Sequence, residues 1–164
     1  MAGEQRRFTF FWQPESPFSQ WHPSEFVVEG KRFVCAEQYM MHGKAVLFGD
    51  LAVAERILAS ISPKMHKALG RKVSGFDEQL WRNERERIVY EGNHAKFTLN
   101  AELLKALLAT AGTELVEASP LDRIWGVGLK AEDPRIQDPA LWRGQNLLGK
   151  VLTRLREDLL ARAG

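Results

Sequence analysis

The chain has 164 residues, of which 45% are hydrophobic and 27% charged, with a net charge of +2. This composition excludes intrinsic disorder, and the length suffices for one domain with its own core. No run of Lys or Arg resembles a nucleic-acid-binding tail, and a single cysteine, Cys35, excludes an intramolecular disulfide framework. Because the first residues lack the apolar core of a secretory leader and no apolar run approaches the roughly 18 residues of a membrane span, we expect a single domain over residues 1–164, located in the cytoplasm.

Three short strands are predicted near the N-terminus. Aromatic and β-branched residues mark the segments 8–12, 25–28 and 31–35. The last two segments flank Glu29-Gly30, a turn sequence suited to joining antiparallel strands. The sequence therefore predicts a β-hairpin at this turn.

Helices are predicted to follow the hairpin. The spacing of apolar residues favours helices over residues 36–47, 51–58 and 63–69. Asp50 and Ser62 precede the second and third of these helices, and short oxygen-bearing side chains at such positions accept N–H groups of the first helical turn. We therefore expect both residues to be N-caps.

The second half of the chain is also predicted to be mainly helical. Asp77 is expected to cap a long helix that Gly92 weakens or bends, and Asn100 to cap an apolar helix through Leu108. A final amphipathic helix is expected over about 145–161. Strands are predicted at 115–118 and 124–129. The fold class expected is therefore α+β, a predominantly helical domain around a small mixed or antiparallel sheet.

Residues 119–129 place an acid, an indole and glycines within one short turn. The carboxylate of Asp122 can stabilise a developing positive charge, and the indole of Trp125 offers a flat surface for a base or sugar. Gly126 and Gly128 would let the backbone approach a ligand. A structural interpretation also fits, with Asp122 closing an Asx turn and Trp125 anchoring the core. The pattern alone leaves both interpretations open.

One face of the helix predicted over residues 36–47 carries charges between apolar residues. Glu37, Met41, Lys44 and Phe48 recur at helical spacing. Glu37 and Lys44 lie two turns apart, about 10 Å along the axis, so they flank a space. They could line a pocket. Alternatively, Glu37 stabilises the helix N-terminus and the Lys44 stem lies along apolar surface.

Trp81 and Arg85 are one turn apart on the long helix. An indole beside a guanidinium can bind a base and a phosphate. Core packing for Trp81 and a surface charge for Arg85 form the alternative interpretation.

Metal and nucleotide motifs receive little support. The segment 144–151 almost matches a phosphate-binding P-loop, but Val151 stands where Ser or Thr would bind magnesium. The four histidines form no pair at metal-ligand spacing, and Cys35 has no cysteine companion. Cys35 is more readily explained as an inert core thiol than as a nucleophile. We expect no metal and no cofactor.

Segments spread over nearly the whole chain carry a family resemblance. In order they are Ser16–Pro23, Cys35–Met41, Lys44-Ala45, Phe48–Asp50, Trp81 with Arg85, Gly92–Phe97, Leu115–Ser119, Asp122 with Trp125–Gly128, and Asn146–Gly149. Their order and separations resemble those of the NADAR family, also called YbiA-like. One departure is Gln20-Trp21-His22, where the family pattern has Asn, then Trp or Phe, then Tyr. The departure leaves the fine substrate preference open.

The resemblance implies an N-glycosidase that hydrolyses the bond between ribose C1 and nitrogen. The implied substrates are ADP-ribose attached to guanine in nucleic acid, or ribosylamino-pyrimidine phosphates of riboflavin biosynthesis. The implied partner is thus a nucleotide or an ADP-ribosylated nucleic acid, with no membrane and no obligate protein partner. The implied hydrolysis is metal-independent.

Site residues are carried over by motif. Those implied to be catalytic are Glu37, Asp122, Lys44 and Trp81; those that would bind substrate are Phe18, Ser19, Arg85, Lys96, Trp125, Gly126 and Asn146. Cleavage of a ribose C1–N bond passes through an oxocarbenium-like transition state, which a nearby carboxylate stabilises.

We assign Glu37 as general base or ribose-hydroxyl holder, Asp122 as transition-state stabiliser and Trp81 as the stacking surface for the base. The two acids could exchange roles. Lys44 could instead form a Schiff base with the ring-opened C1 aldehyde. A non-catalytic ADP-ribose or nucleotide-binding module is the alternative function, and the presence of both acids favours the enzyme.

Overall fold

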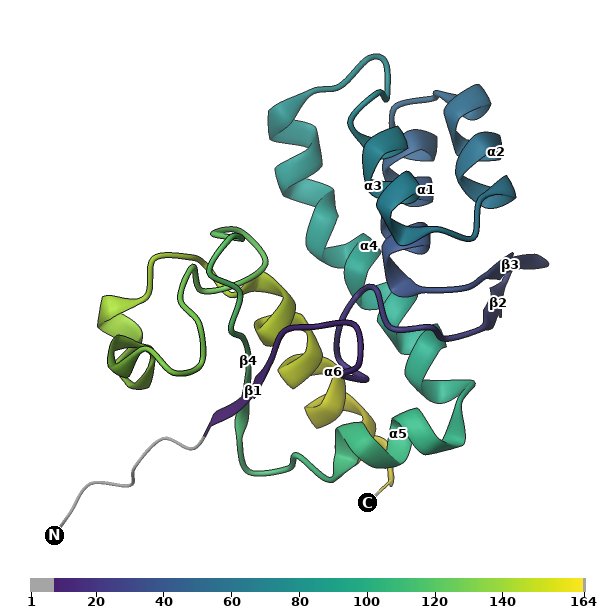
Figure 1. Ribbon diagram of the computed structural model, residues 1–164. Helices are drawn as coiled ribbons and strands as arrows, with labels where there is room; N and C mark the ends of the chain where they lie inside the picture. Colours follow the sequence, from purple (N-terminus) through teal and green to yellow (C-terminus); the bar gives the residue numbers. More distant parts are fainter. Residues whose placement is uncertain (1–7, 164) are drawn as a thin grey trace, which may run out of the picture. The chain divides into compact units, whose positions relative to one another are not determined.

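The computed structural model describes residues 8–163 (Figure 1). Their contacts form two compact units: unit 1 contains residues 8–19 and 105–163, and unit 2 contains residues 20–104. Helices predominate, and the strands form one parallel and one antiparallel pair. The predicted α+β class is therefore confirmed, with two separate pairs of strands in place of one small sheet. No helix of the described chain is long and apolar enough to cross a membrane.

Unit 2 begins with the predicted hairpin. Strands β2, Phe26–Val28, and β3, Lys31–Phe33, pair antiparallel. The turn residues Glu29 and Gly30 have φ angles of 50° and 78°. Both positions of a tight two-residue hairpin turn need positive φ, which explains the glycine. The hairpin is confirmed, with strands shorter than predicted.

Four helices complete unit 2. They are α1, Ala36–Leu47; α2, Leu51–Ala59; α3, Pro63–Gly70; and α4, Glu78–Thr98. The predicted N-caps are all present. The side chains of Asp50, Ser62 and Asp77 accept the backbone N–H groups of Val53, Met65 and Leu80. Helix α1 packs against the other three helices, so it holds the centre of this unit.

Gly92 has a different role from the one predicted. Helix α4 continues through it to Thr98, and Gly92 is buried against the ring of Tyr39 on α1. A Cβ atom at this position would lie 2.5 Å from Tyr39 Cδ1. The glycine therefore permits close packing of α1 and α4, a tertiary requirement that overrides its weak helix propensity.

Unit 1 is built around a parallel strand pair. Strand β1, Phe8–Phe11, pairs with β4, Glu114–Glu117, and α6, Leu147–Ala163, packs against β4. Two short 3₁₀ helices, Pro134–Gln137 and Pro139–Leu141, precede α6. A core cluster consists of Val116, Ala118, Val127, Leu129 and Ile136, with Phe8, Phe10 and Trp142 packed against it.

The predicted strand over 124–129 is wrong. This segment is a loop whose backbone bonds to several other segments: Val127 donates to Glu117, while its carbonyl accepts from Arg143. Gly128 adopts a φ of 70°, which breaks an extended conformation. The apolar residues of this segment are therefore core contacts of a loop, and the segment does not form the regular backbone hydrogen bonds of a paired β-strand.

Helix α5, Ala101–Leu108, contains the boundary between the two units. The carbonyl of Asn100 accepts the N–H of Leu104, so Asn100 does stand at the start of the helix. Its side chain, however, donates to the carbonyls of Glu25 and Lys96 and does not cap the first turn. The predicted position is right and the predicted capping interaction is wrong.

Candidate functional site

Two packed helices of unit 2 bring together residues that the sequence suggested separately. Glu37 and Lys44 come from α1, and Trp81 and Arg85 come from α4. The Nζ atom of Lys44 lies 5.5 Å from the centroid of the Trp81 ring and 4.8 Å from that of Phe76. The face of α1 with Glu37 and Lys44 and the face of α4 with Trp81 therefore belong to one group of side chains.

Burial shapes the electrostatics of this group. The pKa of Lys44 is lowered chiefly by burial, an effect that the negative charges of Glu37 and Glu78 oppose. Glu37 itself is only 5% exposed. A lysine with a lowered pKa has a larger fraction of neutral, nucleophilic amine. The site thus combines a buried carboxylate with an amine that can lose its proton.

Hydrogen bonds fix the first turn of α1, where Glu37 lies. The backbone N–H of Glu37 donates to the carbonyl of Gln20. The side chain of Gln38 accepts the N–H of Val34 at 2.8 Å and donates to the carbonyl of Ile57 at 2.9 Å. Gln38 is a structural residue that sequence reasoning missed, because its partners are distant in the chain and no local motif marks them.

Trp81 and Arg85 are both buried, with 9% and 8% of their surfaces exposed. The burial of Trp81 agrees with the core-packing interpretation. The interpretation of Arg85 as an ordinary surface charge is wrong. A guanidinium buried to this extent is held in a defined position on α4, one turn from the Trp81 indole.

Lys96 lies on α4 and is completely buried. Burial lowers its pKa to about 7, an effect that Cys35 opposes. Its Nζ atom is 4.9 Å from the centroid of the Phe97 ring. Lys96 was predicted to bind substrate, but in this conformation its side chain has no exposed surface that a substrate could contact.

Cys35 is buried beside His66, with Sγ 3.6 Å from Nδ1 of the imidazole. His66 Nε2 lies 2.6 Å from the carbonyl oxygen of Ser60, which can only accept, so Nε2 carries the proton and Nδ1 accepts from the thiol. Burial raises the pKa of Cys35 to about 11. A protonated thiol agrees with the inert role expected for this residue.

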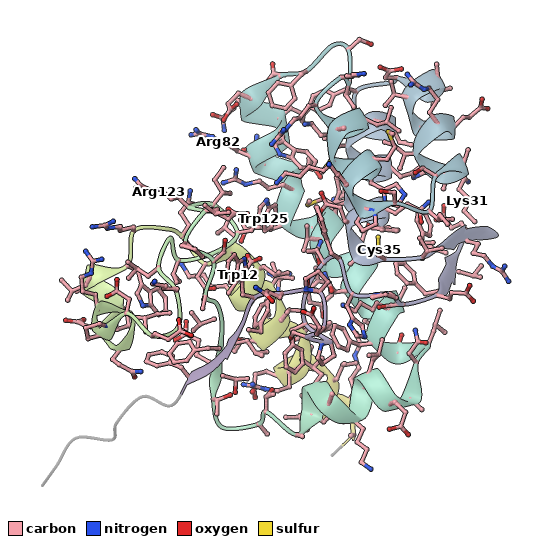
Figure 2. The ribbon with its side chains drawn as sticks, in the orientation of Figure 1. Trp12, Lys31, Cys35, Arg82, Arg123 and Trp125 are labelled. Atoms are coloured by element: carbon pink, nitrogen blue, oxygen red, sulfur yellow. The ribbon has the colours of Figure 1, made fainter. Side chains whose placement is uncertain are left out.

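In unit 1, Asp122 closes the predicted Asx turn. Its Oδ1 atom accepts the N–H groups of Ile124 at 2.9 Å and Trp125 at 2.8 Å. The side chain of Trp125 projects from the loop that follows β4 (Figure 2). The Asx turn expected in the structural interpretation is therefore confirmed. The turn uses Oδ1 alone, and Oδ2 of Asp122 accepts no hydrogen bond from the described residues.

Other predicted contacts of unit 1 have structural roles. A Cβ on Gly126 would lie 3.0 Å from the carbonyl oxygens of both Asp122 and Glu117, so protein backbone packs closely on this glycine. Asn146 is fully buried; its Oδ1 accepts the N–H of Glu117 and its Nδ2 donates to the carbonyl of Leu115. Both polar atoms of Asn146 therefore already serve β4.

Phe18 and Ser19 are both buried. The ring of Phe18 packs edge-on against Phe11 with centroids 5.7 Å apart. The backbone N–H of Ser19 donates to the carbonyl of Ser16. These contacts hold the segment that the family pattern singled out, and they place Phe18 in the packing of unit 1.

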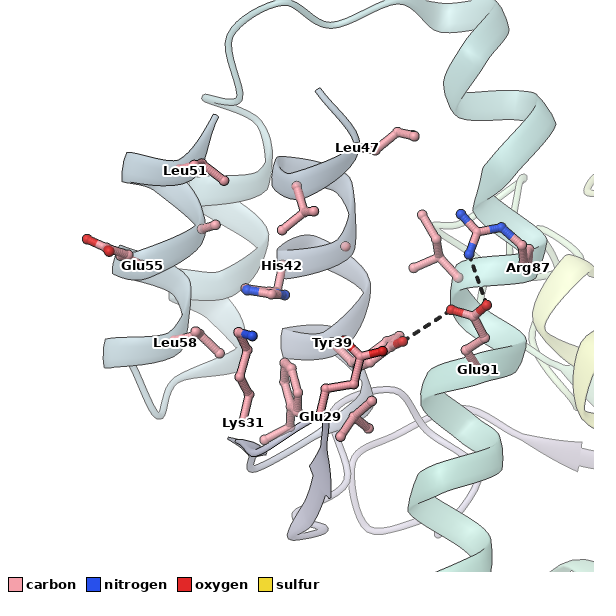
Figure 3. Close-up of a pocket in the computed structure, with 16 residues that line it drawn as sticks. Glu29, Lys31, Tyr39, His42, Leu47, Leu51, Glu55, Leu58, Arg87 and Glu91 are labelled. Atoms are coloured by element: carbon pink, nitrogen blue, oxygen red, sulfur yellow. Dashed lines mark hydrogen bonds and ion pairs between the residues drawn. The ribbon is translucent and has the colours of Figure 1, made fainter. Parts of the chain in front are cut away.

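A pocket of about 720 Å³ lies on the other face of α1, where sequence reasoning placed no site (Figure 3). Tyr39, His42 and Val46 line it, and helical geometry puts them opposite Glu37 and Lys44. On its far wall, Glu91 accepts from Arg87 at 2.9 Å and from the Tyr39 hydroxyl at 3.2 Å. None of the residues predicted to be functional lines this pocket.

Residues 8–163 contain no group of three or more His, Cys, Asp or Glu side chains placed to hold a metal ion. The four residues on α1 and α4 offer instead a carboxylate, an amine, a guanidinium and an indole. Such groups can bind a phosphorylated, base-bearing ligand and move protons at it.

Comparisons with known proteins find relatives that match most of the chain. The chain is 44% identical to N-glycosidase R617 of Acanthamoeba polyphaga mimivirus, over 86% of each chain. It is 40% identical to protein irg-1 of Caenorhabditis elegans, over 94% of this chain and 81% of that protein. The NMR structure of Escherichia coli YbiA is similar, with a TM-score of 0.79 and 29% identity over 98% of this chain and 89% of YbiA. Residues 10–160 match the NADAR domain model, and the chain therefore belongs to the NADAR family.

Proposed function

We propose that this chain is an N-glycosidase that hydrolyses the bond between ribose C1 and a nitrogen atom of a base. The observation that carries the proposal is the group on α1 and α4, in which Lys44 lies over the Trp81 ring and interacts electrostatically with the buried Glu37. Relatives named N-glycosidases, including R617 and the YbiA protein of E. coli K12, support the reaction class.

The reaction needs charge stabilisation and a proton-accepting group. As the C1–N bond breaks, positive charge develops on the ribose, and a carboxylate in a low-dielectric site stabilises it strongly. Glu37 is proposed to act on the attacking water or to hold a ribose hydroxyl. Trp81 is proposed to stack on the base, and Arg85 to bind a phosphate.

Asp122 and Trp125 of unit 1 are proposed to take part as well. Oδ2 of Asp122 is the oxygen that the Asx turn does not use, so a negative charge is held at the surface of a well-defined turn. We assign it to transition-state stabilisation, with the roles of Asp122 and Glu37 open to exchange. This assignment is tested by substitution of Asp122 itself.

Lys44 supports a second mechanism. Its neutral amine can attack C1 of a ring-opened N-riboside; the C1–N bond breaks, the base leaves with a proton, and an imine between C1 and Lys44 remains. Water then hydrolyses this imine to the free C1 aldehyde and restores the amine. The lowered pKa of Lys44 favours this step. Borohydride added during turnover would reduce the imine to a stable adduct on Lys44, visible by mass spectrometry. Turnover without an adduct would contradict the covalent mechanism.

Two substrates are proposed, and one assay compares them. The protein is incubated with an ADP-ribosylated guanosine oligonucleotide and, separately, with a ribosylamino-pyrimidine phosphate, and released base and sugar are followed chromatographically. We expect release from one of them, unchanged by a chelator, and strongly reduced release by Glu37→Gln. Binding of either compound without release would identify a reader of ADP-ribose or nucleotides and would contradict the hydrolase.

A further inference from the structure

An exposed aromatic side chain, Phe76, lies beside the group of residues on α1 and α4. The Nζ atom of Lys44 is 4.8 Å from the centroid of the Phe76 ring and 5.5 Å from that of the Trp81 ring. Phe76 directly precedes Asp77, the N-cap of α4, so it belongs to the connection between α3 and α4. Two aromatic rings from different parts of unit 2 therefore lie close to one amine.

The two rings differ in how far a ligand can reach them. Trp81 is 9% exposed, whereas Phe76 is 44% exposed. Lys44 is partly exposed as well, so the amine and the Phe76 ring are both accessible from solvent. Most of the aromatic surface that a base could contact beside Lys44 therefore belongs to Phe76.

Packing and hydrogen bonds hold Phe76 in place despite its exposure. Its ring packs against that of Phe48, with centroids 5.3 Å apart. On the N-terminal side, the backbone N–H and the hydroxyl of Ser74 donate to Oδ2 of Asp50 at 2.9 and 3.0 Å. On the C-terminal side, Asp77 caps α4 by accepting a backbone N–H of its first turn. A ring held in this way loses little conformational entropy when a ligand binds to it.

Exposure alone does not mark a binding residue, because single apolar side chains are common on protein surfaces. Phe76 differs in its position, since its ring lies against the amine of the proposed reaction site. Aromatic rings that meet solvent and are held rigidly are the usual surfaces on which proteins stack a base.

We propose that Phe76 binds the base of the substrate by stacking and extends to the surface the aromatic contact assigned to Trp81. This inference rests on the proposed function, because it takes the ligand to be an N-riboside bound beside Lys44. It also narrows the substrate class, since the group on C1 should be a planar aromatic base. A purely structural role, packing of the α3–α4 connection on Phe48, is the alternative that the test must separate.

The test compares ligands with and without a base. Binding of guanosine 5′-monophosphate, uridine 5′-monophosphate and ribose 5-phosphate is measured by NMR titration of the full chain, of Phe76→Leu and of Phe76→Tyr. Phe76→Leu keeps an apolar side chain but removes the ring. It should bind at least one nucleotide about 10-fold more weakly, the usual scale for stacking of one base on an aromatic ring, and ribose 5-phosphate as before. Phe76→Tyr keeps the ring and should bind all three ligands like the unsubstituted protein.

Two further variants keep the result interpretable. Ile61→Ala is the control, because Ile61 is an apolar residue of unit 2 that is 82% exposed on the connection between α2 and α3. It should leave all three affinities unchanged. If Phe76→Leu does not fold, Phe76→Met also removes the ring and should show the same selective loss of nucleotide binding.

Three outcomes would overturn the inference: unchanged nucleotide binding by Phe76→Leu, an equal loss for nucleotides and ribose 5-phosphate, or no tighter binding of either nucleotide than of ribose 5-phosphate by the unsubstituted protein. The second would assign Phe76 to packing or to the position of Lys44. Cleavage of an N-riboside by Phe76→Leu with the KM of the unsubstituted protein would contradict this inference alone. Base-dependent binding that requires Phe76, without cleavage, would contradict only the proposed function.

Discussion

Asp122 shows how a single side chain can hold a turn and still offer a charge. One carboxylate oxygen accepts two backbone N–H groups, and the other accepts no hydrogen bond from the described residues. The amide of asparagine has the same shape and keeps one oxygen acceptor. Substitutions at Asp122 can therefore separate the structural role from the proposed catalytic one.

We predict that Asp122→Asn folds normally and lowers kcat at least about 100-fold, the usual scale for one positioned catalytic group. Asp122→Ala should lower kcat similarly and also reduce the free energy of unfolding, because the turn loses both hydrogen bonds. Turnover and urea denaturation are measured for both variants. Normal turnover by Asp122→Asn would remove Asp122 from the catalytic assignment.

Other residue predictions depended on contacts that lie outside local sequence. The period of 3.6 residues correctly puts Glu37 and Lys44 on one face of α1, but it cannot say which face of α4 they meet. The approach of Lys44 to Trp81 follows from the packing of α1 on α4. Burial of Arg85 and Lys96 likewise depends on neighbours far along the chain, which no local pattern shows.

At the scale of helices and strands, the sequence predicts best where the decisive hydrogen bonds are local. Asp50, Ser62 and Asp77 bond to N–H groups three residues ahead, and all three helix starts are correct. The segment 124–129 fails because its backbone partners are distant in the chain. The final helix begins at Leu147 and not at 145 because Asn146 has a φ of 53°, outside the helical region.

Asn146 connects strand β4 to the start of α6, and this gives an element-scale prediction. Asn146→Ala should reduce the free energy of unfolding by roughly 2–4 kcal/mol, since it leaves buried backbone groups of Leu115 and Glu117 unpaired and strains a positive φ. Urea denaturation measures the loss. Asn146→Gly is the matched control, because glycine removes the hydrogen bonds without the φ strain and should lose less. Equal stability of Asn146→Ala and the unsubstituted protein would show that the bonds to β4 contribute nothing.

For the whole molecule, buried titratable groups make stability depend on pH. Burial lowers the pKa of Lys96 from 10.5 to about 7, so between these values the unfolded chain binds more protons than the folded chain. Burial raises the pKa of Cys35 from 9.0 to about 11, which reverses the difference above about pH 9. Burial also lowers the pKa values of His42 and His66 from 6.5. Stability rises with pH wherever the unfolded chain binds more protons, so it should increase from mildly acidic pH to about pH 9 and then level off or decline.

Lys96 dominates the window between about pH 7 and 9, and its substitution tests the pH dependence. The unsubstituted protein should gain about 2 kcal/mol of unfolding free energy across this window, since one proton over one pH unit contributes about 1.4 kcal/mol. Lys96→Met should abolish this rise, because no buried ammonium remains to be neutralised. The difference between its unfolding free energy and that of the unsubstituted protein should therefore be more positive at pH 7 than at pH 9. Lys64→Met, an exposed lysine on α3, should leave the rise unchanged. Urea denaturation at several pH values measures all three proteins. Parallel pH curves for Lys96→Met and the unsubstituted protein would show that Lys96 stays protonated in the folded chain over this window, and would assign the rise to other groups.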